Sequence, residues 1–401
     1  MLDFSRQFAV IGEELMRAIE EVCRSQRFVL GPQVESFEQA AALACDAPHA
    51  IGCASGTDAL WLALAAADIG SSNTVPHSSQ PHRDEWDHTR DAVITSPFSF
   101  FASASAILRA GARPLFADID PLTFNLSAEA SAAILATPAR WNIRAIQPVH
   151  LYGQCADMDA FTALQLSHPG LLLFEDAAQA FGATWKGVPA GALGDAGCFS
   201  FYPTKNLSAM GDAGLLTTRS TQIDQHARSL RAHGMMRRYF HDEVGWNSRL
   251  DTLQAAVLEV KLRYLPAWNQ RRKALAERYD RLFFASGLAT MPTREHPTTI
   301  ADGVVLPYTD PRAGHVFHQY VIRAPRRDDL RAHLTAQGIG SEVYYPLPLH
   351  LQQALLGLGY GTGDFPHAER AAAEVLALPM YPELREDEQD IVVDAIRSFY
   401  A

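Results

Sequence analysis

One lysine stands in a stretch of the sequence where an ordinary surface charge is not expected. Lys205 follows the run Cys198–Thr204, which is rich in aromatic and hydroxyl side chains, and precedes the glycine-bearing segment Met210–Gly214. Burial disfavours the ammonium form of a lysine, so its pKa falls and the amine becomes a nucleophile. A neutral amine forms a Schiff base with an aldehyde, as in enzymes that use pyridoxal phosphate. The alternative is a lysine whose stem packs on the protein while its charge reaches water.

A carboxylate occupies a second position where chemistry is expected. Asp176 follows the apolar segment Leu171–Phe174, which is typical of a strand covered on both faces of a parallel sheet. A carboxylate at the end of such a strand is costly unless a cation lies beside it. A pyridinium nitrogen is a suitable partner, because this pairing keeps a pyridoxal ring protonated and electron-withdrawing. An aspartate that caps the N-terminus of a following helix is the alternative.

Residues 49–60 have the pattern of an anion site. His49–Cys53 predicts a short buried strand, and Ser55, Gly56 and Thr57 then open a helix rich in Ala and Leu. The first N–H groups of a helix lack partners within the helix, and the helix dipole favours an anion there. Gly56 lets the backbone come close, while Ser55 or Thr57 adds a hydroxyl donor. A hydroxyl residue at this place is equally expected as an ordinary N-cap.

Short apolar strands alternate with helices in the segments that position these residues. This alternation predicts an α/β fold with a mostly parallel, doubly wound sheet, whose site lies outside the carboxyl ends of its strands. Its strands are predicted at 92–95, 114–117, 143–149 and 171–174, with a helix at 100–108.

The remaining pattern predicts a second, smaller α/β domain at the C-terminus. We place the boundary between a large domain, residues 1–255, and this small domain, residues 256–401. Helices are predicted at 8–24, from 34, from around 246–251 to 285, at 328–337 and at 386–399, and strands at 320–322 and 343–346.

Composition limits the classes of function. The chain has 401 residues, of which 48% are hydrophobic and 20% charged, so it has enough apolar side chains for a large core. Its net charge of −11 argues against a general nucleic-acid or anionic-membrane surface. No apolar run approaches the ~20 residues of a membrane helix, and no signal peptide is recognised. Five scattered cysteines fit reduced thiols, so we expect a cytoplasmic protein.

Residues 71–90 differ in composition from their surroundings, and this composition predicts a polar loop inserted into the large domain. The segment is rich in Ser and His, and its three histidines, His77, His82 and His88, raise the question of a metal site. They lack the helical or C-x-x-C spacing of metal ligands, so a solvated loop is favoured and no metal is expected.

Together these stretches resemble the DegT/StrS family of nucleotide-sugar aminotransferases, which use pyridoxal 5'-phosphate. The resemblance covers essentially the whole chain and implies fold type I, the fold of aspartate aminotransferase. Each motif alone is weak, but all of them in this order are specific. The motifs lie at residues 54–60, 175–180, 199–207, 247–251 and 345–350.

The resemblance implies a role for each matching residue. Lys205 is the catalytic lysine, which forms the aldimine with the cofactor and then moves the proton, and Asp176 pairs with the pyridinium nitrogen. Phe100 stacks on the cofactor ring, although a core residue opening a helix is the alternative. The other implied contacts are the ring hydroxyl (Gln179), the cofactor phosphate (Gly56, Thr57, Ser200), the phosphate of the neighbouring subunit's cofactor (Asn247) and the sugar pocket (Tyr345, His350).

The implied reaction is a ping-pong transamination. Glutamate donates an amino group that passes to a nucleotide-linked sugar with a keto group at C3 or C4, in amino-sugar, polysaccharide or glycoconjugate biosynthesis. Because Asn247 acts across subunits, the resemblance also implies a homodimer with shared sites. Alternatives are a sugar dehydratase that uses the same cofactor and a non-catalytic regulator. In the deoxygenating branch of the family histidine replaces the lysine, so Lys205 favours transamination.

Three departures from the family pattern remove no group that the mechanism needs. They are the long loop at 71–90, Trp246 where methionine is common and Ala213 where glycine is common. The nucleotide diphosphate needs hydrogen-bond donors from basic side chains or backbone N–H groups. The alternative explanation of the basic side chains in this region is that they belong to an exposed helix face. The basic candidates are Arg231, His233, Arg237 and Arg238.

Overall fold

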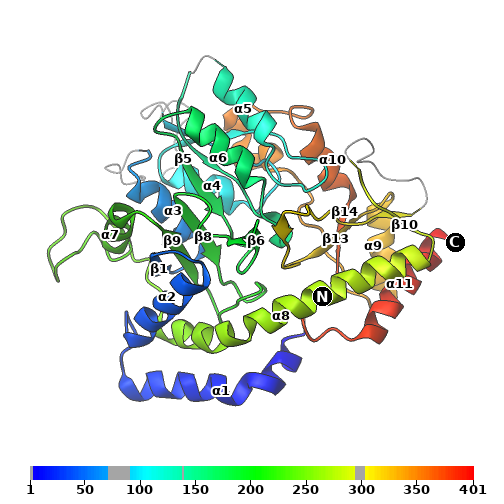
Figure 1. Cartoon of the computed structure of the whole chain (residues 1–401), viewed down its shortest axis with the longest axis horizontal. Coiled ribbons are helices and arrows are strands. Elements are labelled where there is room, and N and C mark those ends of the chain that lie inside the picture. The colour runs from blue at the N-terminus through cyan, green and yellow to red at the C-terminus, as the bar shows by residue number, and fades with distance from the viewer. Residues whose placement is uncertain (1–2, 71–90, 138–139, 294–302) are drawn as a thin grey trace.

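In the computed structural model a seven-stranded sheet forms the centre of the larger part of the molecule (Figure 1). The structure describes residues 3–70, 91–137, 140–293 and 303–401, so the predicted loop at 71–90 lies outside the described residues. The strand order is β1-β9-β8-β5-β4-β2-β3. The strands are β1 (His49–Cys53), β2 (Asp91–Thr95), β3 (Arg113–Phe116), β4 (Asn142–Gln147), β5 (Leu172–Asp176), β8 (Ala196–Ser200) and β9 (Gly214–Thr218).

Strand direction brings the predicted chemical residues to one edge of this sheet. Neighbouring strands from β8 to β3 pair in parallel, and only β9 runs the opposite way, between β1 and β8. Asp176, the last residue of β5, pairs in register with Cys198 of β8, so both strands end on the same side. The chain that leaves β8 there carries Lys205. The predicted mostly parallel α/β sheet is confirmed.

Helices cover both faces of the sheet because the strand residues alternate between two apolar cores. Val93 packs in a core with α3, α4 and α7, whereas its neighbours Ala92 and Ile94 pack in a core with α2, α6 and α8. Helix α1 lies beside α8 through Ile11 and Leu15 (Figure 1). These helices are α1 (Phe4–Ser25), α2 (Pro32–Ala44), α3 (Gly56–Ala66), α4 (Ala102–Arg109), α5 (Ala128–Ala136), α6 (Met158–Ser167), α7 (Thr221–Leu230) and α8 (Thr252–Ala285), with the 3-10 turn η2 (Leu151–Gly153).

The C-terminal part has its own four-stranded sheet, in the order β10-β11-β13-β14. Helix α8 joins the two parts, since Leu258 lies in a core of the large sheet and Tyr279 in the core of the small one. The predicted boundary at 255/256 falls within this continuous helix and stays a prediction. The remaining elements are β6 (Thr184–Trp185), β7 (Val188–Pro189), β10 (Ala289–Thr290), β11 (Val304–Val305), β12 (Ala313–Gly314), β13 (Tyr320–Arg323), α9 (Arg327–Ala336), η3 (Leu349–Leu351), η4 (Gln353–Leu358), α10 (Pro366–Glu374), β14 (Val375–Leu378) and α11 (Glu386–Tyr400), with β12, β6 and β7 forming a small third sheet.

The strand predicted at 343–346 is wrong. Only Glu342 makes a backbone bridge there, to Ala377, and the chain then turns without a ladder. Pro346 and Pro348 have no N–H to donate to a neighbouring strand, which explains why the β-prone Val343 and the tyrosines after it do not extend the sheet. None of the helices in the described part of the chain has the length and apolar character to cross a membrane.

Candidate active site

Lys205 lies in the connection between β8 and β9, at the carboxyl end of β8. Backbone hydrogen bonds hold this connection: the Phe201 N–H donates to the Ala213 carbonyl and the Lys205 N–H to the Tyr202 carbonyl, both at 2.8 Å. Burial of the amine lowers the pKa of Lys205 to about 8, although the negative charge of Asp176 opposes this effect. A substantial minority of the amine is therefore neutral at physiological pH and can act as a nucleophile.

Asp176 is a buried carboxylate that makes no ion pair at contact distance with any of the described residues. Only 4% of its surface is exposed, and the hydroxyl of Ser103 donates to its Oδ2 at 2.6 Å. Burial raises the pKa of Asp176, while the bond from Ser103 and the charge of Lys205 lower it. No helix begins at Asp176, so the N-cap alternative does not apply. A buried acceptor that lacks a cation fits the pyridinium nitrogen of pyridoxal phosphate.

The structure brings Gln179, Tyr345 and Phe100 together beside this carboxylate. The Gln179 Nε2 donates to the Tyr345 hydroxyl at 3.1 Å, and its Oε1 accepts from the Tyr152 N–H at 2.6 Å. The ring centroids of Phe100 and Tyr345 lie 6.3 Å apart. Phe100 is 60% exposed, whereas Phe98 is fully buried. Phe100 is thus an open aromatic face at the site and not a core residue, which fits a ring-stacking position.

Gly56 and Ser200 form a close junction between the start of α3 and the end of β8. A Cβ on Gly56 would lie 2.5 Å from the Ser200 Cβ, so only glycine fits without displacement. The Ser55 hydroxyl accepts from the Asp58 N–H at 3.1 Å and is the N-cap of α3. Thr57 follows in the first helical turn. This junction offers a helix N-terminus and a serine hydroxyl at one place, which fits a phosphate.

Two predicted site residues lie apart from this group. Asn247 precedes α8, where its backbone bridges to Ala232, and no hydrogen bond of the described residues joins it to the other predicted site residues. His350 is fully buried, 3.1 Å from the Glu369 Oε1 through its Nε2, and its ring packs against Phe365. Within one chain, therefore, the structure brings neither of them to Lys205.

Two of the basic candidates for binding a diphosphate, Arg231 and Arg237, already have partners within the chain. Arg231 is buried and donates to the carboxylate of Glu38 and to the carbonyl of Gly52, each at 2.5 Å. Arg237 lies over the ring of Phe240. A buried arginine that already serves one carboxylate and one carbonyl is a structural group, so the interpretation of Arg231 as a diphosphate donor is wrong.

Sequence reasoning missed two polar residues at the site. Ser103 stands three residues after Phe100, a spacing that places both on one side of a helical turn, and this was the available signal. His318 comes from the segment before β13; its Nδ1 lies 3.1 Å from the Oδ1 of Asn206, the residue after Lys205. Burial lowers the pKa of His318, and the charge of Lys205 adds to this effect. A histidine so distant in the chain gave no local signal.

Comparison with known proteins agrees with this geometry. A scan against protein families matches residues 9–397 to the DegT/DnrJ/EryC1/StrS aminotransferase family. Among curated proteins, the chain is 45% identical to the pleiotropic regulatory protein of Geobacillus stearothermophilus, over 100% of this chain and 98% of the relative. It is 38% identical to the dTDP-3-amino-3,4,6-trideoxy-alpha-D-glucose transaminase of Streptomyces venezuelae, over 99% of this chain and 95% of the relative.

A third relative and a solved structure extend the comparison. The UDP-N-acetyl-3-dehydro-alpha-D-glucosamine 3-aminotransferase of Acidithiobacillus ferrooxidans is 38% identical over 99% of this chain and 96% of its own length. The crystal structure of S. venezuelae DesV superposes with a TM-score of 0.87 at 38% identity, and the match covers 99% of this chain and 97% of that one.

Proposed function

We propose that this chain, which belongs to the DegT/DnrJ/EryC1/StrS aminotransferase family, transfers an amino group from glutamate to the C3 keto group of a nucleotide-linked sugar. As a member of that family the chain is an aminotransferase that uses pyridoxal phosphate. The observation that carries the proposal is the pairing of a lysine of lowered pKa with a buried carboxylate that has no cation, at the ends of adjacent parallel strands.

Lys205 and Asp176 perform the central roles in this proposal. The cofactor, when bound, supplies an electron sink that lets a proton leave the carbon bearing the nitrogen. Lys205 accepts and returns that proton at its Nζ, and a pKa of about 8 suits both directions near neutral pH. Asp176 accepts from Ser103, which holds its orientation toward the ring nitrogen and offsets part of the rise in its pKa that burial causes.

The phosphate is held at the junction of α3 and β8. Gly56 and Thr57 present the first turn of α3, and the hydroxyl of Ser200 adds a donor. Asn247 completes the phosphate site of a second copy, so the active unit is a homodimer. Large apolar side chains that one chain leaves exposed support this assembly, among them Phe28, Val29, Leu30 and Tyr202.

The names of the relatives support a sugar nucleotide with the reacting group at C3. The relatives from S. venezuelae and A. ferrooxidans are both named for an amino group at that position. Phe100, Gln179 and Tyr345 surround the ring of the cofactor and the sugar that meets it. His350 remains a candidate for the sugar pocket. The five free cysteines support a cytoplasmic location. The large domain, 1–255, holds the cofactor, and the small domain, 256–401, closes the site.

A labelled amino donor tests this function. Purified protein with ¹⁵N-glutamate and a panel of nucleotide 3-keto and 4-keto sugars is followed by mass spectrometry. The expected result is ¹⁵N in the product of a 3-keto sugar and loss of transfer in Lys205→Ala. Transfer only to 4-keto sugars overturns the C3 assignment, and a deoxygenated product without ¹⁵N indicates the dehydratase alternative. The name of the G. stearothermophilus relative keeps a regulatory role as the second candidate, which predicts no turnover with any sugar.

A further inference from the structure

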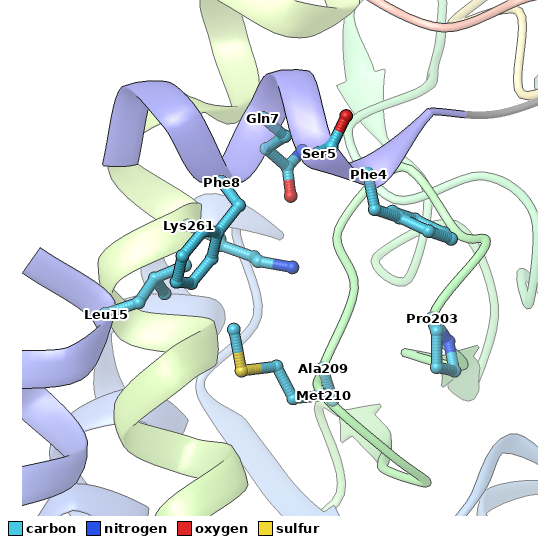
Figure 2. Close-up of a pocket in the computed structure, with 9 residues that line it drawn as sticks. All are labelled: Phe4, Ser5, Gln7, Phe8, Leu15, Pro203, Ala209, Met210 and Lys261. Atoms are coloured by element: carbon cyan, nitrogen blue, oxygen red, sulfur yellow. The ribbon is translucent and has the colours of Figure 1, made fainter. Parts of the chain in front are cut away.

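A cavity lies between α1, α8 and the chain segment that carries Lys205. It has a volume of about 390 Å³, within the range of small-ligand sites. Phe4 and Phe8 of α1 and Met210 of the β8–β9 connection provide apolar walls (Figure 2). Neither Lys205 nor Asp176 lines it, so it is distinct from the proposed cofactor site.

One charged group enters this apolar space. Lys261 of α8 is 4% exposed, and its amine points into the middle of the cavity between Phe8 and Met210 (Figure 2). Its amine donates to the hydroxyl of Ser208 at 3.0 Å, and the negative charge of Glu383 raises the pKa of Lys261 against the larger lowering effect of burial. Within the described ranges no carboxylate lies at ion-pair distance from the amine. A buried ammonium with one neutral partner leaves donors unused, which costs free energy unless an anion completes them.

The surroundings of Lys261 decide which anion fits. The single ammonium of Lys261 matches the charge of one carboxylate, whereas a phosphate dianion needs several cationic or backbone donors. Phe4, Phe8 and Leu15 offer apolar surface to the rest of the ligand, and Ser5 and Gln7 are the other polar residues that line the cavity. The ligand class is therefore an unbranched monocarboxylate whose carbon chain lies along these walls.

We propose that the cavity between α1, α8 and the β8–β9 connection is a binding site for a small aliphatic monocarboxylate, with Lys261 as its counter-ion. This inference goes beyond the proposed function and does not rest on it, because the readout is binding and not turnover. It assigns a function to a buried lysine that transamination does not use.

Calorimetric titration of the cofactor-loaded protein with hexanoate tests the site. We expect one site per chain, with binding at least tenfold weaker in Lys261→Met. Each buried methylene is worth about a fourfold change in affinity, so hexanoate should bind up to about fifteenfold more tightly than butanoate. Hexanol, which has the chain without the charge, should bind more weakly than hexanoate.

Two further variants serve as controls. Lys273 lies exposed on the same helix, so Lys273→Met removes an equal charge outside the cavity and should leave binding unchanged. Met210→Trp fills the cavity from the opposite wall and should abolish binding while Lys261 remains. The proposal is overturned if hexanoate does not bind at 20 mM. That result is expected if a second copy of the chain fills the cavity. It is also overturned if Lys261→Met and Lys273→Met bind equally, or if hexanol binds as tightly as hexanoate.

Discussion

The lowered pKa of Lys205 makes its reactivity in the cofactor-free protein predictable. A pKa of about 8, against an ordinary 10.5, leaves roughly a quarter of the amines neutral at pH 7.5 instead of roughly one in a thousand. Only the neutral amine reacts with an acylating reagent. Lys205 should therefore be acetylated about two hundred times faster than an exposed lysine of equal intrinsic reactivity.

Competitive labelling with acetic anhydride between pH 6 and 11, followed by mass spectrometry of the peptide, measures this midpoint. The rate at Lys205 should rise with pH and level off above about 8. Asp176 is the negative charge that raises the pKa of Lys205, so Asp176→Asn should move the midpoint to lower pH. A midpoint near 10.5, or a shift to higher pH in Asp176→Asn, would refute the electrostatic reasoning.

Three further outcomes are expected. Gly56→Ala places a Cβ 2.5 Å from that of Ser200, so the free energy of unfolding should fall by about 1–3 kcal/mol, and cofactor affinity should fall with it; unchanged values in equilibrium unfolding and cofactor titration would contradict the close junction. Ser103→Ala removes a buried hydrogen bond to a carboxylate, worth about 1.5–3 kcal/mol, and should raise the pKa of Asp176, seen as a displaced pH profile of the bound cofactor's absorbance. Mixing unfolded Lys205→Ala and Asn247→Ala chains and refolding them together should restore about a quarter of wild-type activity, since about half of the dimers are mixed and each has one intact site; no recovery would exclude a site shared between subunits.

Much of the fold could be predicted because its determinants are local. The apolar runs that end at Ile94 and Phe174 are continuous, as expected for a sheet covered on both faces, and helices follow each of them. The reversed direction of β9 could not be predicted, since nothing within Gly214–Thr218 differs from a parallel strand. The tyrosines after Val343 favour a strand by propensity, but the prolines that follow leave the segment without a ladder.

The candidate site likewise contains residues that local sequence pattern predicts and residues that it does not. Lys205, Asp176 and Gly56 lie within a few residues of a strand end or a helix start, so local pattern finds them. Ser103 and His318 reach the site only through tertiary contacts, from α4 and from the segment before β13. The spacing of residues within a strand or helix carries no information on such contacts. Lys261 is a similar case, because the sequence does not distinguish a lysine on the buried face of a long helix from one on its solvated face.

Two lysines of lowered pKa lie in or beside the connection between β8 and β9, and their partners separate their roles. Burial lowers the pKa of both to about 8. The negative charge that acts on Lys205 is that of Asp176, whereas the one that acts on Lys261 is that of Glu383, and the Lys261 amine also donates to the hydroxyl of Ser208. Labelling at pH 8 should therefore show that the cofactor protects Lys205 and leaves Lys261 reactive, while hexanoate protects Lys261 and leaves Lys205 reactive. If either ligand protected both amines equally, the two sites would not be independent, and the assignment of a separate anion to Lys261 would fail.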